Sequence, residues 1–240
     1  MKKIFLFFFW LFAYIPAYAQ MTFTDIILDI RSGINDSGPY DYHFSTSTLI
    51  RKINAVMNEA CSLTGAIEGR AYYTTYSGVR EYSLPSDCIG KKVLRAAYWI
   101  SPSTSSFKRL EQFSIPELDA AYNKVWENRT SGLPINYYLR ADKIGLVPAP
   151  SATYSTSTAM MVDYIKYPAQ ASSVTLSSYP FSGLTYLYPY HKLIVIGVIA
   201  DITGNVSTKQ EYYALLERMM IEVNDKPDAW TGKKIFDKER

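Results

Sequence analysis

The chain is poor in the residues from which active sites and metal sites are usually built. Its 240 residues include two histidines, His43 and His191. It contains no nucleophile elbow, zinc-binding helix motif, phosphate-binding loop or dinucleotide-binding glycine motif. His191 has no second histidine or cysteine nearby in the sequence to complete a metal site, so we interpret it as a partly buried structural side chain. The sequence therefore predicts no catalytic residue, no metal and no cofactor.

The other reactive side chains also favour structural roles. Asp87, Asp119 and Asp201 would form a carboxylate site only if they converged, and the first two occupy turn and helix positions where aspartate is common. The two cysteines, Cys61 and Cys88, lack C-x-x-C spacing. Cys61 lies on the apolar face of an expected helix, so we interpret it as a buried free thiol. Pairing with Cys88 is the alternative in an exported protein.

An excess of charge is also missing. The chain has 25 Lys and Arg against 22 Asp and Glu, a net charge of +3, and two of the lysines lie in the first twenty residues. Tight, non-specific binding to DNA depends on clustered Lys and Arg. The composition therefore gives little support to a protein that holds DNA tightly.

One apolar run stands out, at residues 4–15. Lys2 and Lys3 precede it, and Ala17-Tyr18-Ala19 follows as a small-x-small cleavage site. This order is typical of a secretory signal peptide. Twelve apolar residues are too few for a comfortable membrane span.

Met21 gives the first segment other interpretations. Residues 21–27 look like a natural protein start, and Thr22 with Asp25 forms a plausible helix cap. Residues 1–20 are therefore a signal peptide, a leader upstream of the true start, or a hydrophobic arm. The sequence leaves these three open.

Helices are expected at both ends of the chain. Apolar residues recur at helical spacing over residues 22–34 and 46–63. Residues 191–203 are apolar on every side, which predicts a helix buried on every side. Ser207 with Gln210 is expected to cap a last helix. Its apolar face would consist of Tyr212, Leu216, Met219, Met220 and Val223.

The middle of the chain favours strands. Residues 71–76 are rich in Tyr and Thr, and Ser77-Gly78 is expected to turn the chain into a strand over residues 79–84. The spacing of the strands predicts an antiparallel sheet or small sandwich. Further expected elements are strands at 92–100 and 158–167, a loop at 101–106, a helix from Ile115 to about Trp126 capped by Ser114 and Glu117, and a hairpin joining 135–139 to 143–147.

The predicted fold class is therefore α+β. We expect helices from the N- and C-terminal parts to form a bundle, with an antiparallel, β-rich, sandwich-like region inserted between them. The predicted segments are a leader (1–20), N-terminal helices (21–68), the β-rich insert (69–170), C-terminal helices (187–224) and a tail (225–240).

Tyrosine is abundant, with 21 residues. Tyr72, Tyr73, Tyr137 and Tyr138 suggest a packed sheet face or a contact with another subunit or a tail protein. A stacking platform for nucleic acid is disfavoured, because the neighbouring residues are mainly Thr, Ser and Leu rather than Arg and Lys.

The tail carries three large apolar residues, Trp230, Ile235 and Phe236, beside Lys233 and Lys234. So short a segment cannot bury them against itself. It is expected to dock into a groove on a partner with Trp230 as the anchor. A frayed terminus is the alternative.

Four junctions occur in a characteristic order: a strand closed by proline, a capped helix, a hairpin and the start of an apolar helix. With helices on both sides, this order resembles the head-to-tail adaptor (connector) proteins of tailed bacteriophages. The resemblance covers residues 21–224. The signatures are REYSLPSD at 80–87, SIPELD at 114–119, GLPINYYL at 132–139 continuing through KIGLVPAP at 143–150, and LYPYHKL at 187–193.

The resemblance implies a non-enzymatic virion protein, assembled in the host cytoplasm. Copies would form a ring, usually a dodecamer, between the portal protein and a tail (nozzle or tube) protein. Genomic DNA would pass through the lumen without tight binding, and the C-terminal tail would reach the portal. The alternative, supported only by residues 1–19, is a secreted or periplasmic interaction module.

Overall fold

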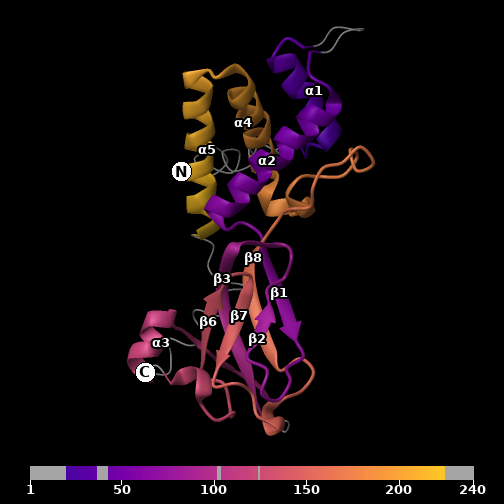
Figure 1. Cartoon of the computed structure of the whole chain (residues 1–240). Coiled ribbons are helices and arrows are strands. Elements are labelled where there is room, and N and C mark those ends of the chain that lie inside the picture. Colours follow the sequence, from indigo (N-terminus) through magenta and orange to yellow (C-terminus); the bar gives the residue numbers. More distant parts are fainter. Residues whose placement is uncertain (1–19, 37–42, 102–103, 124, 225–240) are drawn as a thin grey trace, which may run out of the picture. The chain divides into compact units, whose positions relative to one another are not determined.

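The chain folds as an α+β protein with five α-helices and two mostly antiparallel sheets among the described residues (Figure 1). The computed structural model describes residues 20–36, 43–101, 104–123 and 125–224. The chain divides into two compact units, and the limits between them fall after residues 57, 168 and 219. The helical unit contains residues up to 57 and 169–219, and the sheet-rich unit contains 58–168 and the residues from 220 onward. Two helices, α2 (Thr46–Thr64) and α5 (Val206–Asn224), each cross one of these limits.

Helix α1 (Phe23–Gly33) begins as its sequence predicts. The Thr22 side chain accepts from the Asp25 N–H, and the Asp25 carboxylate accepts from the Thr22 N–H. Two further N–H groups at this helix start, those of Phe23 and Thr24, donate to the Ser178 and Leu176 carbonyls. The segment that contains Leu176 and Ser178 therefore satisfies donors that a helix start leaves open.

Helix α4 (His191–Thr203) is buried on nearly every side, as predicted, and Gly204 ends it in the left-handed conformation. Gly197 allows neighbouring helices to approach. A Cβ at this position would lie 2.8 Å from the Tyr212 ring on α5 and 2.8 Å from Val56 on α2. Ile199 packs against Gly33 of α1. Helices from both ends of the chain thus meet at α4, and a regular bundle stays a prediction.

Helix α5 differs from the prediction at its start and along one face. Asn205, not Ser207, caps it, because the Asn205 side-chain oxygen accepts from the N–H groups of Ser207 and Thr208. Tyr212 and Leu216 are buried as expected, whereas Met220 is 40% exposed.

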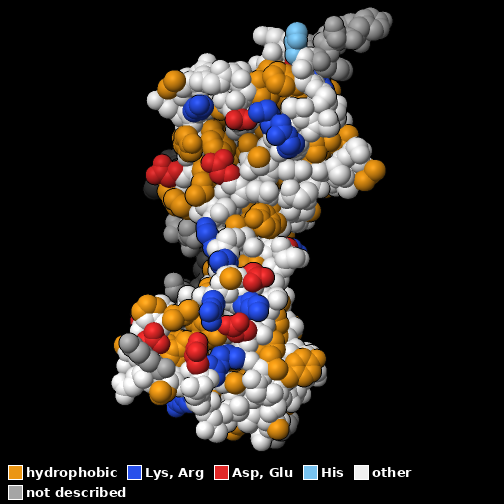
Figure 2. Space-filling model, in the orientation of Figure 1, with side chains coloured by type: hydrophobic (Ala, Val, Ile, Leu, Met, Phe, Trp, Pro, Cys, Tyr) orange, Lys and Arg blue, Asp and Glu red, His pale blue; other side chains and the backbone are white. Residues whose placement is uncertain are grey.

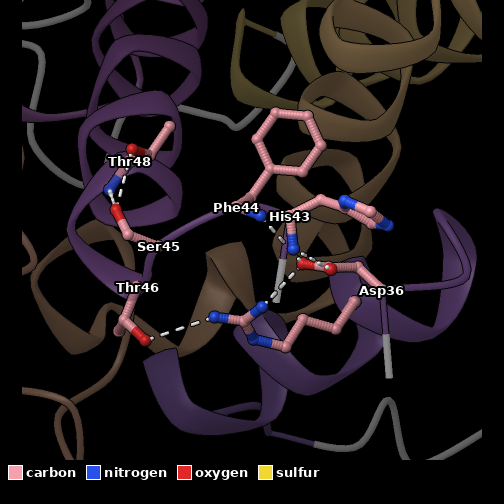
Figure 3. A network of polar contacts seen from close by, with 7 residues as sticks. Asp36, His43, Phe44, Ser45, Thr46 and Thr48 are labelled. Carbon is pink, nitrogen blue, oxygen red and sulfur yellow. Dashed lines mark hydrogen bonds and ion pairs between the residues drawn. The ribbon is translucent and has the colours of Figure 1, made fainter. Parts of the chain in front are cut away.

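A buried polar network joins α1 to the start of α2 (Figure 3). The Arg31 guanidinium lies 2.7 Å from the Asp36 carboxylate, and both side chains are almost fully buried. Asp36 also accepts from the backbone N–H groups of His43 and Phe44. Arg31 donates to the Thr46 hydroxyl at 3.3 Å. One carboxylate therefore organises the entry into α2.

The sheet-rich unit contains two four-stranded sheets. Sheet A has the order β1-β8-β3-β4, and sheet B has the order β2-β7-β6-β5. Sheet A consists of β1 (Glu68–Tyr73), β8 (Met160–Lys166), β3 (Cys88–Ser101) and β4 (Thr104–Arg109). Sheet B consists of β2 (Glu81–Ser83), β7 (Lys143–Val147), β6 (Asn136–Arg140) and β5 (Glu111–Gln112).

The strand pairing corrects two expectations. The strands on either side of Ser77-Gly78 belong to different sheets: β1 pairs with β8, and β2 pairs with β7. Much of the expected loop at 101–106 belongs to β4, which pairs with β3. The β5 strand pairs with β6 in parallel. By contrast, the β6–β7 hairpin is as predicted.

The two sheets face each other across a shared core. Tyr98 and Val162 come from sheet A, and Tyr137 and Ile144 come from sheet B. Side chains alternate along a strand, so the neighbour of Tyr137, Tyr138, points to the opposite face of sheet B.

Helix α3 (Ile115–Ala121) covers that opposite face. Ser114 and Glu117 form the predicted capping box, but the helix ends at Ala121 instead of Trp126. Trp126 begins a 3₁₀ turn and packs edge-on against Tyr138 with ring centroids 5.1 Å apart. The 3₁₀ segments are Trp126–Asn128, Ala152–Tyr154, Phe181–Gly183 and Thr185–Tyr190.

Candidate interaction surfaces

The face of sheet A that points away from the core carries an ion triad. Arg70 on β1 and Arg95 on β3 lie on either side of Asp163 on β8, and the register places each directly opposite it. Arg70 donates from Nε to Asp163 Oδ1 at 2.6 Å, and Arg95 donates from Nε to Oδ2 at 2.9 Å. Two guanidinium groups share one carboxylate, which leaves the triad with a net positive charge.

Tyr72 lies beside this triad and is 52% exposed. It belongs to β1, yet its ring centroid lies 6.4 Å from that of Phe107 on β4. Met161 and Ala97 occupy the strands between them and are nearly buried. The two rings therefore lean toward each other over the middle of the sheet. Tyr and Arg on an open face are typical of protein–protein contacts.

The other three candidate tyrosines are less accessible. Tyr73 points into the inter-sheet space beside Tyr82, and burial raises its pKa to about 12. Tyr137 and Tyr138 are 3% and 1% exposed. The Tyr138 hydroxyl donates to Glu81 at 2.9 Å. Tyr137 and Tyr138 therefore belong to the packed core, because sheet A covers one face of β6 and α3 covers the other.

The structure does not bring the three candidate aspartates together into a site. Asp87 accepts from the Tyr164 hydroxyl, Asp119 accepts from the Trp126 indole N–H, and Asp201 pairs with Lys52. No group of three or more His, Cys, Asp or Glu suited to a metal ion occurs among the described residues. Each of these carboxylates thus has a local structural role.

Both cysteines are free thiols in the described structure. Cys61 is fully buried, and burial raises its pKa to about 12. A thiol held in its protonated form is a poor nucleophile. This agrees with a packing role for Cys61.

His191 is buried at the start of α4, as the sequence suggested. Its Nδ1 accepts from the Met21 backbone N–H at 3.2 Å, and its ring lies 5.2 Å from that of Tyr188. The Tyr188 hydroxyl accepts from the Gln20 side chain at 2.7 Å. Residues 20 and 21 are thereby fixed to the helical unit.

Acidification is expected to destabilise the helical unit through His191. Burial lowers the pKa of His191 from 6.5 to about 4. The unfolded chain then takes up a proton near pH 6.5, whereas the folded chain resists protonation until about pH 4. The stability due to neutral His191 is complete above pH 6.5 and is lost as the pH falls, by up to about 1.4 kcal/mol per pH unit. Urea unfolding followed by helical circular dichroism measures this slope. Replacement His191→Asn should reduce the slope above about pH 5, and an unchanged slope would contradict the assignment.

Two candidate segments lie outside the described residues. They are residues 1–19 and the tail with Trp230, Lys233, Lys234, Ile235 and Phe236. Within the part of the chain that is described, no helix combines the length and the apolar character required to cross a membrane.

Charged side chains of both signs are interspersed with apolar ones on the face shown in Figure 2. This agrees with the small net charge of the chain. A mixed surface of this kind differs from the clustered Lys and Arg of a nucleic-acid-binding face.

The comparison with protein families shows to which family the chain belongs. The family model described as SU10 adaptor protein matches residues 21–235. The chain belongs to the SU10 adaptor protein family, a family of phage head-to-tail adaptors. The match begins at Met21 and confirms the resemblance derived from the four junction signatures. No curated protein matches the chain.

Proposed function

We propose that this adaptor protein forms a ring between the portal and the tail of the virion, where it helps to retain the packaged genome and to conduct it during ejection. The match to the adaptor family over residues 21–235 carries this proposal. Adaptor families have structural roles, which agrees with the absence of catalytic motifs from the sequence. The partners are the portal protein, a tail nozzle or tube protein and further copies of the chain, twelve in all by the usual pattern of the family.

The composition of the C-terminal segment of the chain supports a contact with the portal. Residues 225–240 carry Trp230, Ile235 and Phe236 beside Lys233 and Lys234. Large apolar anchors flanked by cations suit a groove with an acidic rim. In this proposal the C-terminal segment of the chain enters the portal. The sheet-rich unit contacts the protein of the phage tail.

The proposal predicts assembly that depends on the portal. Purified adaptor should change from a small species to a ring-sized complex when the portal protein of the same phage is added. Light scattering and native mass spectrometry measure both the size and the number of copies. Truncation before Asp228 should abolish binding to the portal while the far-ultraviolet circular dichroism remains. If the purified chain neither binds the portal nor changes in size when the portal is added, the proposed function is refuted.

A further inference from the structure

The outward face of sheet A places an aromatic pair next to the ion triad. Tyr72 lies two residues after Arg70 on β1, so both side chains point to the same side of the sheet. Hydrogen bonds, first to Asp163 and then to Tyr72, raise the pKa of the Arg70 guanidinium, so the pair and the triad are in direct contact. Phe107 on β4 contributes the second ring of the pair. The face thus offers an apolar area and a cationic area side by side.

The triad keeps donors that its carboxylate does not use. Arg70 and Arg95 each bond to Asp163 through Nε and Nη2. The Nη1 atom of Arg95 has no protein acceptor among the described residues. The Arg70 and Arg95 side chains are 34% and 20% exposed, whereas that of Asp163 is 12% exposed. An incoming group therefore meets guanidinium N–H donors before it meets the carboxylate.

Two further charged side chains leave the net charge of this face unchanged. Glu68 lies two residues before Arg70 on β1, so it is on the same face. Arg109 lies two residues after Phe107 on β4 and is also on this face. Their opposite charges balance, and the positive charge of the triad remains. This excess of positive charge favours an acidic occupant.

The parts of the chain outside the described residues do not suit this face. Residues 1–19 contain no Asp or Glu, and the C-terminal segment places its apolar residues beside Lys233 and Lys234. Nucleic acid is also disfavoured, because phosphate-binding faces carry clustered Lys and Arg, whereas Asp163 lies between the two arginines here. Arginine beside exposed aromatic rings instead suits an acidic segment of another protein.

We infer that the outward face of sheet A binds the protein of the phage tail, through a segment of that protein in which a carboxylate lies next to an apolar side chain. The carboxylate accepts from the remaining N–H groups of Arg70 and Arg95. The apolar side chain packs on the rings of Tyr72 and Phe107. This inference rests on the proposed function and assigns the contact with the phage tail to one face of the sheet-rich unit.

Binding of the tail nozzle or tube protein of the same phage to preassembled complexes of adaptor and portal tests this contact. Arg70→Gln and Tyr72→Ala should each weaken the binding about tenfold in biolayer interferometry, because each removes part of one contact area. The affinity of the wild type should fall as salt is added, and Arg70→Gln should reduce this dependence. Ring formation with the portal should be unchanged in both variants.

Arg140→Gln is the matched control. Arg140 lies on β6 of sheet B, and its side chain is 59% exposed, so this variant should bind the tail protein like the wild type. Far-ultraviolet circular dichroism and urea unfolding verify that every variant is folded. Normal binding by both Arg70→Gln and Tyr72→Ala, or equal weakening by Arg140→Gln, would overturn the inferred contact.

Other results would assign the face to a different occupant. Loss of ring formation in Arg70→Gln would assign it to contact between copies of the chain, and this would overturn the inference. Binding of a short DNA duplex that Arg70→Gln abolishes would overturn it in favour of nucleic acid. A wild type that forms no ring with the portal would instead refute the proposed function, whereas a normal ring with unaffected variants refutes only the inferred contact.

Discussion

Replacing Asp36 with alanine is expected to lower the free energy of unfolding of the helical unit by about 3–5 kcal/mol. The Asp36 and Arg31 side chains are almost fully buried and lie 2.7 Å apart. Removal of the carboxylate deprives the buried Arg31 guanidinium of its ion pair with Asp36. It also removes the acceptor for the N–H groups of His43 and Phe44 (Figure 3). Both losses act on the same turn of chain, so the start of α2 should loosen first.

The matched control for this substitution is Asp201→Ala. Asp201 also forms an ion pair in the helical unit, with Lys52 at 2.5 Å, but its side chain is 59% exposed. Water screens such a pair, so its loss should cost at most about 1 kcal/mol. The contrast separates the effect of burial from the effect of losing a carboxylate.

Urea unfolding followed by helical circular dichroism gives the two free energies. Hydrogen exchange at the amides of His43 and Phe44 adds a local readout, since both should lose protection in Asp36→Ala alone. The variant Asp36→Asn keeps an acceptor without the charge and should fall between the two. Equal destabilisation by Asp36→Ala and Asp201→Ala would contradict the importance of the buried network.

The sequence predicted the elements whose ends are set by neighbouring residues. The capping boxes of α1 and α3 lie within four residues, and the apolar run at 191–203 has the same limits as α4. The β6–β7 hairpin closes across two residues. In each case the residues that fix the end of the element are close together in the sequence. The local sequence pattern is therefore enough to predict that end.

Pairing between distant strands could not be derived in this way. A hairpin spacing between β1 and β2 is compatible with two different sheets, and only the partners β8 and β7 decide between them. The polar sequence of β4 lacks the alternation that marks a strand. It gains its place by pairing with β3.

The candidate surface was predicted only in part, for the same reason. Tyr72 is exposed as a contact residue should be, whereas Tyr138 lies beneath α3. Arg70 and Asp163 are 93 positions apart in the sequence, so no local spacing of residues predicts their ion pair. A tyrosine-rich strand signals a packed face, but only tertiary packing shows which side of it remains open.

Tyr138→Ala is expected to destabilise the sheet-rich unit by about 3–5 kcal/mol. The Tyr138 ring is buried against Trp126 and Val147 beneath α3, and its hydroxyl donates to Glu81. Truncation therefore opens a cavity and removes a hydrogen bond. The matched control is Tyr72→Ala on the open face of sheet A, which is half exposed and should cost much less.

Gly145 makes this prediction sharper because its backbone lies directly under the Tyr138 ring. A Cβ at Gly145 would lie 2.1–2.6 Å from three atoms of that ring, closer than any packed side chain tolerates. Gly145→Ala alone should therefore cost about 1–3 kcal/mol through overpacking. In the Tyr138→Ala background the added methyl group enters the vacated space, so the same substitution should cost nothing or restore some stability. Urea unfolding of the four proteins, followed by tryptophan fluorescence, measures this coupling. Additive free energies would show that the ring of Tyr138 is not what requires glycine at position 145.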